Sequence, residues 1–118
     1  MPKKNERELF DLCNRYWYDC EEEDSEAMVN GVKNILGWIN HHKNDAAHLK
    51  AALLYTDKYG STGLHCVVSV NDAPFEVVEA WLKHAPETAQ IKGEYGWLPL
   101  HYACDHRSSL KVVMALFE

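Results

Sequence analysis

Apolar residues recur every three or four positions along much of the chain, which predicts an all-helical protein. The first predicted helix covers residues 5–20, and the second covers about 26–42 with Ser25 as its cap. In each helix the spacing gathers the apolar side chains on one face. Those of the first helix are Leu9, Leu12, Cys13, Tyr16 and Trp17, and those of the second are Val29, Val32, Ile35, Leu36 and Ile39.

Two connecting segments complete the N-terminal half. Residues 21–25 form an acidic loop that we expect to be solvated. Residues 43–56 are rich in Ala and Leu, which favour helix, so this segment predicts one or two additional helical turns.

The C-terminal half contains a duplication. Residues 60–65 (GSTGLH) return 36 residues later as residues 96–101 (GWLPLH). The segments that follow also correspond, because residues 75–82 (FEVVEAWL) match residues 110–117 (LKVVMALF) at an offset of 35. A period in this range is typical of stacked helical repeats, in which each short helix pair buries its apolar face against a neighbour.

The duplicated segment resembles the ankyrin repeat. The motif of that family is a turn with Asp and Gly, then Thr-Pro-Leu-His opening a short helix, then a second helix with paired valines and leucines. The first copy has Asp57, Gly60 and residues 62–65 (TGLH), with Gly63 in place of the proline. Thr62 is suited to cap the short helix.

The second copy departs from the motif at other positions. It has Gly93 where Asp is usual and Leu98 where Thr is usual, but it keeps residues 99–101 (PLH) and Ala103. Pro99 suits the first turn of a helix, where its missing N–H is not needed. The resemblance covers residues 57–118, about half of the chain.

The resemblance implies an all-α, ankyrin-like α-solenoid of stacked helix-turn-helix repeats with an N-terminal helical cap. Residues 57–92 are then one repeat, and residues 93–118 are a second repeat that is truncated. Residues 1–56 form an N-terminal helical pair with two interpretations. The pair is either a degenerate capping repeat, because terminal repeats of solenoids are often atypical, or a separate hairpin packed on the stack.

The second repeat stops inside its second helix. We expect its apolar residues to face outward without a neighbour, and these are Val112, Val113, Leu116 and Phe117. Burial of such side chains is worth roughly 1.5–3 kcal/mol each. The end of the stack is therefore expected either to continue in a longer parent protein or to be an interaction surface.

In the ankyrin family, partners bind the hairpin tips and the inner helices, beside the turn glycine and a few residues past the motif histidine. Carried onto this sequence, the resemblance implies ten partner-binding residues. They are Lys58, Tyr59, Ser61, Ser69 and Val70 in the first repeat, and Glu94, Tyr95, Trp97, Asp105 and His106 in the second.

Three aromatic residues, Tyr59, Tyr95 and Trp97, lie beside the turn glycines, where the packing of a repeat does not require aromatic rings. Rigid aromatic side chains are favoured at interfaces and supply much of the binding energy there. The alternative is that they pack sideways onto the neighbouring hairpin. The sequence leaves both interpretations open.

Composition narrows the class of partner. The chain has 118 residues, 47% of them hydrophobic, and four Trp, which indicates a folded domain. Its net charge of −6 argues against nucleic acid, whose phosphates require Lys and Arg. No apolar run is long enough to span a membrane, and residues 1–8 lack the pattern of a signal peptide, so we expect an intracellular, cytoplasmic protein.

Candidate chemistry is sparse. His101, Cys104 and His106 are the best case for a metal site, but they do not share one helix face and no second cluster supplies a fourth ligand. A nucleophile pair of Cys104 with a distant His has no supporting local signature. The resemblance instead makes His65 and His101 structural, because in that family such residues hydrogen-bond the turn and the adjacent repeat. We expect no cofactor and no enzymatic activity.

The sequence therefore predicts a non-catalytic protein-protein interaction module or scaffold that binds another protein through its hairpin tips and concave helix face. The alternative is a structural repeat unit that self-associates through its exposed ends. A His/Cys metal-binding protein is the third hypothesis.

Overall fold

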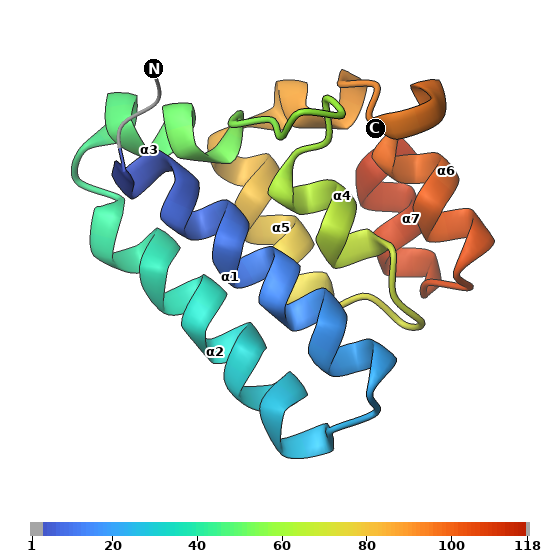
Figure 1. The fold of residues 1–118 in the computed structure, drawn as a ribbon. Helices are drawn as coiled ribbons and strands as arrows, with labels where there is room; N and C mark the ends of the chain where they lie inside the picture. The colour runs from blue at the N-terminus through green and yellow to red at the C-terminus, as the bar shows by residue number, and fades with distance from the viewer. Residues whose placement is uncertain (1–3, 118) are drawn as a thin grey trace.

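The computed structural model describes residues 4–117 (Figure 1). This part of the chain is all-α, as predicted, and its only β-type pairing is an isolated bridge between Thr56 and Thr62. The α-helices are α1 (Lys4–Glu21), α2 (Ser25–His42), α3 (Ala46–Leu53), α4 (Gly63–Val68), α5 (Phe75–His84), α6 (Pro99–Asp105) and α7 (Leu110–Phe117). Two 3-10 helices, η1 (Pro86–Gln90) and η2 (Glu94–Gly96), lie between α5 and α6.

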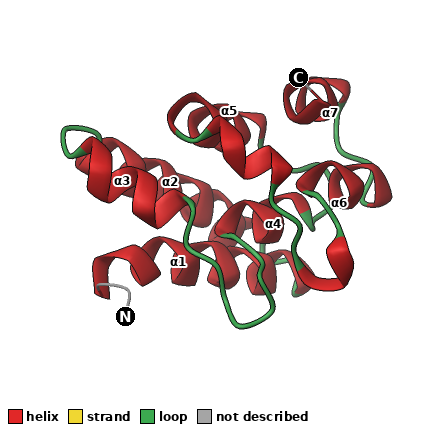
Figure 2. Cartoon of the chain, turned by 90° about the horizontal axis from the view of Figure 1, so that it is seen from above, coloured by secondary structure: helices red, strands yellow, loops and turns green. Residues whose placement is uncertain are grey.

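The helices form two layers. In the inner layer α4 packs against both α1 and α6, and in the outer layer α5 packs against both α2 and α7. Each inner helix also packs against the outer helix that follows it, which gives the pairs α1–α2, α4–α5 and α6–α7. Figure 2 shows the two rows seen from above, with α3 beside α2 at one end.

The apolar stripes predicted for the first two helices form the core between them. Leu9 and Cys13 of α1 and Ile35 of α2 are fully buried. The stripe of α2 does not reach its first turns, because Val29 is 55% exposed although it was predicted on the apolar face. The pattern therefore locates the core correctly but overstates its length at the N-terminal end of α2.

Aspartate side chains begin α2 and α3. The Asp24 carboxylate accepts a hydrogen bond from the Ala27 backbone N–H at 3.1 Å, so the predicted cap at Ser25 is wrong by one position. The Asp45 carboxylate accepts from the His48 backbone N–H at 3.2 Å in the same way. Each bond satisfies a backbone donor that the first turn of a helix leaves unpaired.

Trp81 of α5 connects the two halves of the molecule. Its ring is fully buried, and its indole N–H donates to the Leu53 carbonyl at the end of α3, at 3.2 Å. The ring also covers the first turn of α4, where a Cβ atom on Gly63 would lie only 2.6 Å from it. This contact explains why the first copy of the duplicated segment has glycine where the ankyrin motif has proline.

The two copies of the duplicated segment have the same turn conformation. In each, the backbone N–H that opens the turn donates to a carbonyl four residues later, at 2.9 Å for Asp57 and 2.8 Å for Gly93. Gly60 and Gly96 occupy the same place in their turns, with positive φ angles of 85° and 73°. The duplication in the sequence is thus a duplication of backbone structure.

The last helix is better packed than the sequence predicts. Val112 and Leu116 are 0% and 3% exposed, because α7 packs against α5 and α6. The expectation that they face outward is therefore wrong. The uncovered apolar side chains of α7 are Leu110, Met114 and Phe117, which are 75%, 47% and 73% exposed, so the expectation is correct for Phe117.

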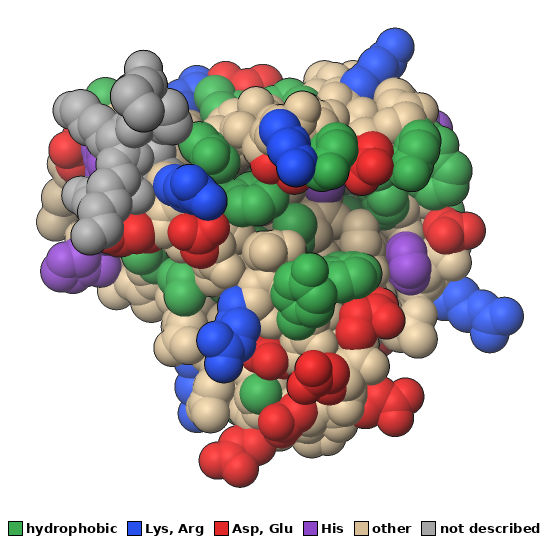
Figure 3. Space-filling view, in the orientation of Figure 1, with side chains coloured by type: hydrophobic (Ala, Val, Ile, Leu, Met, Phe, Trp, Pro, Cys, Tyr) green, Lys and Arg blue, Asp and Glu red, His purple; other side chains and the backbone are tan. Residues whose placement is uncertain are grey.

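Apolar and acidic side chains gather at different places on the surface that carries α1. Figure 3 shows hydrophobic side chains along the upper edge, where the two hairpin turns lie, and acidic side chains below, around the turn between α1 and α2. Among residues 4–117, no helix combines the length and the hydropathy needed to cross a membrane.

The contact between Gly63 and Trp81 gives a test of the core. Gly63→Ala should lower the free energy of unfolding by about 2 kcal/mol, because the new Cβ overpacks a fully buried ring. Gly37→Ala is the matched control: no atom lies within 4 Å of a Cβ there, so the substitution should stabilise the protein by about 0.5–1 kcal/mol through helix propensity. Urea denaturation followed by circular dichroism measures both, and equal stability of the two variants would contradict the tight packing.

Candidate interaction surface

A groove of about 500 Å³ lies between α1 and the inner helices α4 and α6, next to the two hairpin turns. We call it the front groove. Side chains from four parts of the chain meet in it, although they are far apart in sequence. They are Phe10, Asn14, Trp17 and Glu21 of α1, Asp57, Tyr59 and Ser61 of the first turn, His65, Cys66 and Ser69 of α4 and its end, and Glu94, Tyr102 and His106 of the second copy.

The front groove combines aromatic rings with carboxylates. Among its lining residues the aromatic ones are Phe10, Trp17, Tyr59 and Tyr102, and the acidic ones are Glu21, Asp57 and Glu94. The pKa of Tyr102 is raised, first by its partial burial and then by the negative charge of Glu94. Glu21 and Glu94 form no ion pair within the described residues, whereas the Asp57 carboxylate already accepts from the Tyr59 and Ser61 backbone N–H groups at 2.9 and 3.0 Å. Lys58 of this chain lies over the Tyr59 ring, with its Nζ atom 5.1 Å from the centroid. A groove with ring faces and carboxylates of this kind is suited to a cationic side chain.

The upper wall of the groove is fixed by His65, which is 2% exposed. Its Nδ1 atom accepts a hydrogen bond from the Thr62 backbone N–H at 3.0 Å, and the Thr62 hydroxyl lies 2.8 Å from the same nitrogen. Because Nδ1 accepts, the proton is on Nε2, which donates to the Ile91 carbonyl at 3.0 Å. Burial lowers the pKa of His65, so the ring is neutral in the folded protein.

His101 repeats half of this arrangement. Its Nδ1 atom accepts from the Leu98 backbone N–H at 2.9 Å, as His65 does from Thr62, but its ring is exposed. The structural role predicted for both histidines is therefore confirmed for the turns. His65 also bonds the Ile91 carbonyl, at the end of its own copy and two residues before Gly93.

One hydrogen bond joins the two hairpin turns directly, and another joins the second turn to α6. The Glu94 backbone N–H donates to the Ser61 hydroxyl at 3.1 Å, and the Tyr102 hydroxyl donates to the Glu94 carbonyl at 3.1 Å. A Cβ atom on Gly93 would lie 2.8 Å from both the Ser61 hydroxyl and the His65 ring. The second copy therefore has glycine where the motif has Asp, because the neighbouring turn approaches too closely for any side chain.

The aromatic residues at the second tip differ in their contacts. Tyr95 is 84% exposed and has a positive φ of 65°, which is unusual for a residue other than glycine. Trp97 is 40% exposed, and its ring packs against Tyr102 with centroids 5.2 Å apart and lies 6.2 Å from His101. Trp97 thus packs on its own α6 and not on the neighbouring hairpin, whereas Tyr95 projects into solvent.

The ten residues predicted to bind a partner divide into three groups. Five line the front groove, and these are Tyr59, Ser61, Ser69, Glu94 and His106. Four are exposed outside its lining, and these are Lys58, Tyr95, Trp97 and Asp105. Val70 is 4% exposed and belongs to the core, so its side chain is not part of an accessible surface.

Two of the groove residues have internal roles as well. Ser61 is 8% exposed, and its hydroxyl is occupied by the Glu94 backbone N–H. The Ser69 hydroxyl donates to the His65 carbonyl at 2.6 Å. These two serines therefore shape the groove more than they offer free hydrogen-bonding groups.

The sequence interpretation did not identify the contribution of α1 to the groove. Phe10, Asn14, Trp17 and Glu21 fall at i, i+4, i+7 and i+11, so they form a second stripe on α1 beside the buried one. The spacing was a usable signal. From the sequence, Trp17 was expected on the buried stripe and Glu21 in the acidic loop, and no role was assigned to Phe10 or Asn14.

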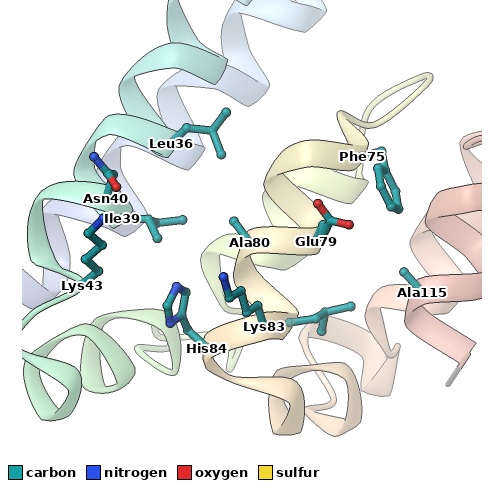
Figure 4. Close-up of a pocket in the computed structure, with 11 residues that line it drawn as sticks. Leu36, Ile39, Asn40, Lys43, Phe75, Glu79, Ala80, Lys83, His84 and Ala115 are labelled. Carbon is teal, nitrogen blue, oxygen red and sulfur yellow. The ribbon is translucent and has the colours of Figure 1, made fainter.

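A second and larger groove, of about 960 Å³, lies in the outer layer between α2, α5 and α7, and we call it the outer groove. Figure 4 shows it in close-up, with α2 on one side, α7 on the other and α5 between them. It shares no lining residue with the front groove. The sequence interpretation contained no candidate site here.

The described part of the structure supports neither the metal-binding hypothesis, made for His101, Cys104 and His106, nor the nucleophile hypothesis. Within residues 4–117, no three His, Cys, Asp or Glu side chains gather in a way that could hold a metal ion. Cys66 lines the front groove, but burial and then the Asp57 carboxylate raise the pKa of its thiol to about 12. A thiol with this pKa is protonated at neutral pH and is a poor nucleophile.

The chain was compared with protein-family models, with curated proteins and with solved structures, and none of the three comparisons gave a match. The structure thus defines the class of the protein, an all-α protein of two helical layers with a groove on each side. What it binds is inferred below from its own side chains.

The buried, neutral His65 predicts a specific pH dependence. Because its folded pKa lies below the ordinary value of 6.5, the unfolded chain takes up a proton first as the pH falls. The contribution of His65 to the free energy of unfolding should therefore be constant above about pH 7 and decrease below 6.5, by at most about 1.4 kcal/mol per pH unit, until the folded pKa is reached. Urea denaturation at several pH values measures the slope.

The control variants isolate His65 from the other histidines. His65→Gln should be about 2 kcal/mol less stable than the natural protein at pH 7.5, because it loses the bond to Thr62, and its stability should depend less on pH. His101→Gln, at the exposed equivalent position, should keep the slope of the natural protein. Identical slopes in all three proteins would show that His65 does not titrate as described.

Proposed function

We propose that the chain is a non-catalytic protein-interaction module built from two stacked ankyrin-like repeats, residues 57–92 and 93–118, with α1 and α2 as a capping pair. Three observations support this arrangement. The turns of the two copies match, the helices alternate between an inner and an outer layer, and the Glu94 backbone N–H of the second turn donates to the Ser61 hydroxyl of the first. In such a stack the repeat core holds the turns rigid while the turn side chains vary.

The front groove and the tips beside it are the proposed binding surface. The observation that carries the proposal is the lining of the groove by four aromatic rings and three carboxylates. This combination suits an extended segment of a partner that inserts a Lys or Arg side chain between the rings, with Tyr95 and Trp97 contacting the flanking residues. The net charge of −6 also favours a basic partner.

An array of 15-residue peptides that differ in the charge of the central residue tests this proposal. Peptides with a central Lys or Arg in an apolar context should bind, and the same peptides with Glu at that position should not. Tyr59→Ala should weaken binding by about 1–2 kcal/mol without changing the melting temperature, because the ring is 55% exposed. Phe117→Ala is the control, since Phe117 is an aromatic residue that is 73% exposed and lies outside the groove.

The tip residues extend the same experiment. Tyr95→Asn keeps a residue type that tolerates positive φ and should weaken binding with no loss of stability. Trp97→Ala should weaken binding and also lower stability, because the ring packs on Tyr102. An array with no preference for positive charge, or equal losses for Tyr59→Ala and Phe117→Ala, would reject the proposed groove.

Self-association is the second candidate, and the exposed Leu110, Met114 and Phe117 of α7 favour it. Our proposal predicts a monomer by size-exclusion chromatography with light scattering across a wide concentration range. A dimer that dissociates in a Leu110→Glu, Met114→Glu double variant, but not in Val29→Glu, would instead support self-association through α7. Val29 is a suitable control because it is 55% exposed on the distant α2.

A further inference from the structure

Four aromatic rings gather where α2 ends and α3 begins, outside both grooves. Three of them are histidines: His41 and His42 are the last two residues of α2, and His48 is in the first turn of α3. The fourth is Trp38, one turn before His42. None of these residues lines the front groove or the outer groove, so the proposed binding surface does not account for them.

The orientation of the His42 ring is fixed by Trp38. The Nδ1 atom of His42 lies 2.8 Å from the Trp38 backbone carbonyl, and its ring stacks on the indole with centroids 3.8 Å apart and 19° between the planes. A carbonyl oxygen only accepts, so Nδ1 carries a proton, and the lone pair of the neutral ring is on Nε2. Histidines that bind metals commonly have this arrangement, in which the second ring nitrogen donates to a backbone carbonyl.

His48 supplies a second imidazole nitrogen close to the first. Its Nε2 atom is buried and has no hydrogen-bond partner among the described residues. A buried polar atom that is left unpaired is costly, so a ligand that satisfies it gains free energy. The centroid of the His48 ring is 5.6 Å from that of His42, with 41° between the planes.

This separation is close to that of two histidines that share one metal ion. With metal–nitrogen bonds of about 2.0–2.1 Å, each ring centroid lies about 3.2 Å from the ion. Two rings at an angle of about 109–120° around the ion then have centroids about 5.2–5.5 Å apart. His42 and His48 are thus brought within reach of a common ion by the packing of α2 and α3.

We propose that His42 and His48 bind one divalent transition-metal ion through their Nε2 atoms, with water in its remaining positions. The site has two protein ligands only, in keeping with the lack of any metal-holding cluster of three His, Cys, Asp or Glu side chains within residues 4–117. Imidazole ligands suit Ni²⁺, Cu²⁺ and Zn²⁺. The Trp38 indole N–H is also buried without a partner and can donate to a water on the ion. The bound ion joins the end of α2 to the start of α3.

Ni²⁺ is the probe, added to protein without a polyhistidine tag that has been treated with EDTA and dialysed. Isothermal titration calorimetry should give one site per chain. His42→Gln and His48→Gln should each weaken the affinity at least about tenfold, because each removes one of the two ligands. His41→Gln is the matched control and should bind as the natural protein does, although its ring lies only 5.0 Å from that of His42. His106→Gln, in the front groove, is the distant control.

Two further measurements report where the ion binds. Ni²⁺ at His42 lies beside the stacked Trp38 indole and should quench its fluorescence, so Trp38→Phe should lose the quenching but keep the affinity. Folding brings the two histidines together, so the ion binds the native state preferentially. Saturating Ni²⁺ should therefore raise the melting temperature of the natural protein by several degrees and leave that of His48→Gln unchanged.

Several results would overturn the proposal. If no Ni²⁺ binds, the unpaired nitrogens of His48 and Trp38 belong to a site for water only. Binding that is unchanged in both His42→Gln and His48→Gln, or that is lost in His41→Gln, would place the ion elsewhere. Circular dichroism checks that each variant is folded. If a variant does not fold, nuclear magnetic resonance of the natural protein decides, because bound Ni²⁺ must broaden the ring signals of His42 and His48 more than those of the other histidines.

Discussion

The position of the second hairpin turn depends on one buried imidazole. His65 accepts from the Thr62 backbone N–H at the start of α4 and donates to the Ile91 carbonyl 26 residues later. No other neutral side chain offers an acceptor and a donor at this separation on one rigid ring. Because both bonds are buried, either is costly to leave unmade, so the ring fixes the two turns relative to one another and thereby the upper wall of the front groove.

The departures from the ankyrin motif follow from the same close packing. His65 and the Ser61 hydroxyl occupy the space that an Asp at position 93 would need, and the Trp81 ring occupies the space of a proline at position 63. Each glycine is therefore a consequence of a large or hydrogen-bonded group inserted beside it. Such substitutions weaken the motif in the sequence while the backbone of the turn is kept, so an imperfect motif and an intact turn are compatible.

The sequence predicted the features that depend on local spacing. The helices over 5–20 and 26–42, the extra turns after residue 43 and the two matching turns are all set by periodicity, Gly and capping residues.

The sequence-based prediction failed where packing against other helices decides the outcome. Val112 and Leu116 are buried because α5 and α6 lie against α7, which their own spacing does not reveal. The α1 stripe became part of a groove only because α4 lies beside it, and the outer groove exists because small side chains lie between three helices.

The charged side chains of the two grooves are mainly of opposite sign. The outer groove has Lys43 and Lys83 beside the C-terminal ends of α2 and α5, where cations offset the helix dipole. The front groove takes its carboxylates from the end of α1 and from the two hairpin turns, Glu21, Asp57 and Glu94. The core between α4 and α5 contains fully buried valines. A partner bound in one groove therefore meets no loosely packed element through which it could change the conformation of the other groove. If both grooves are binding sites, we therefore expect their partners to bind without strong coupling, which is the behaviour of a scaffold and not of an allosteric switch.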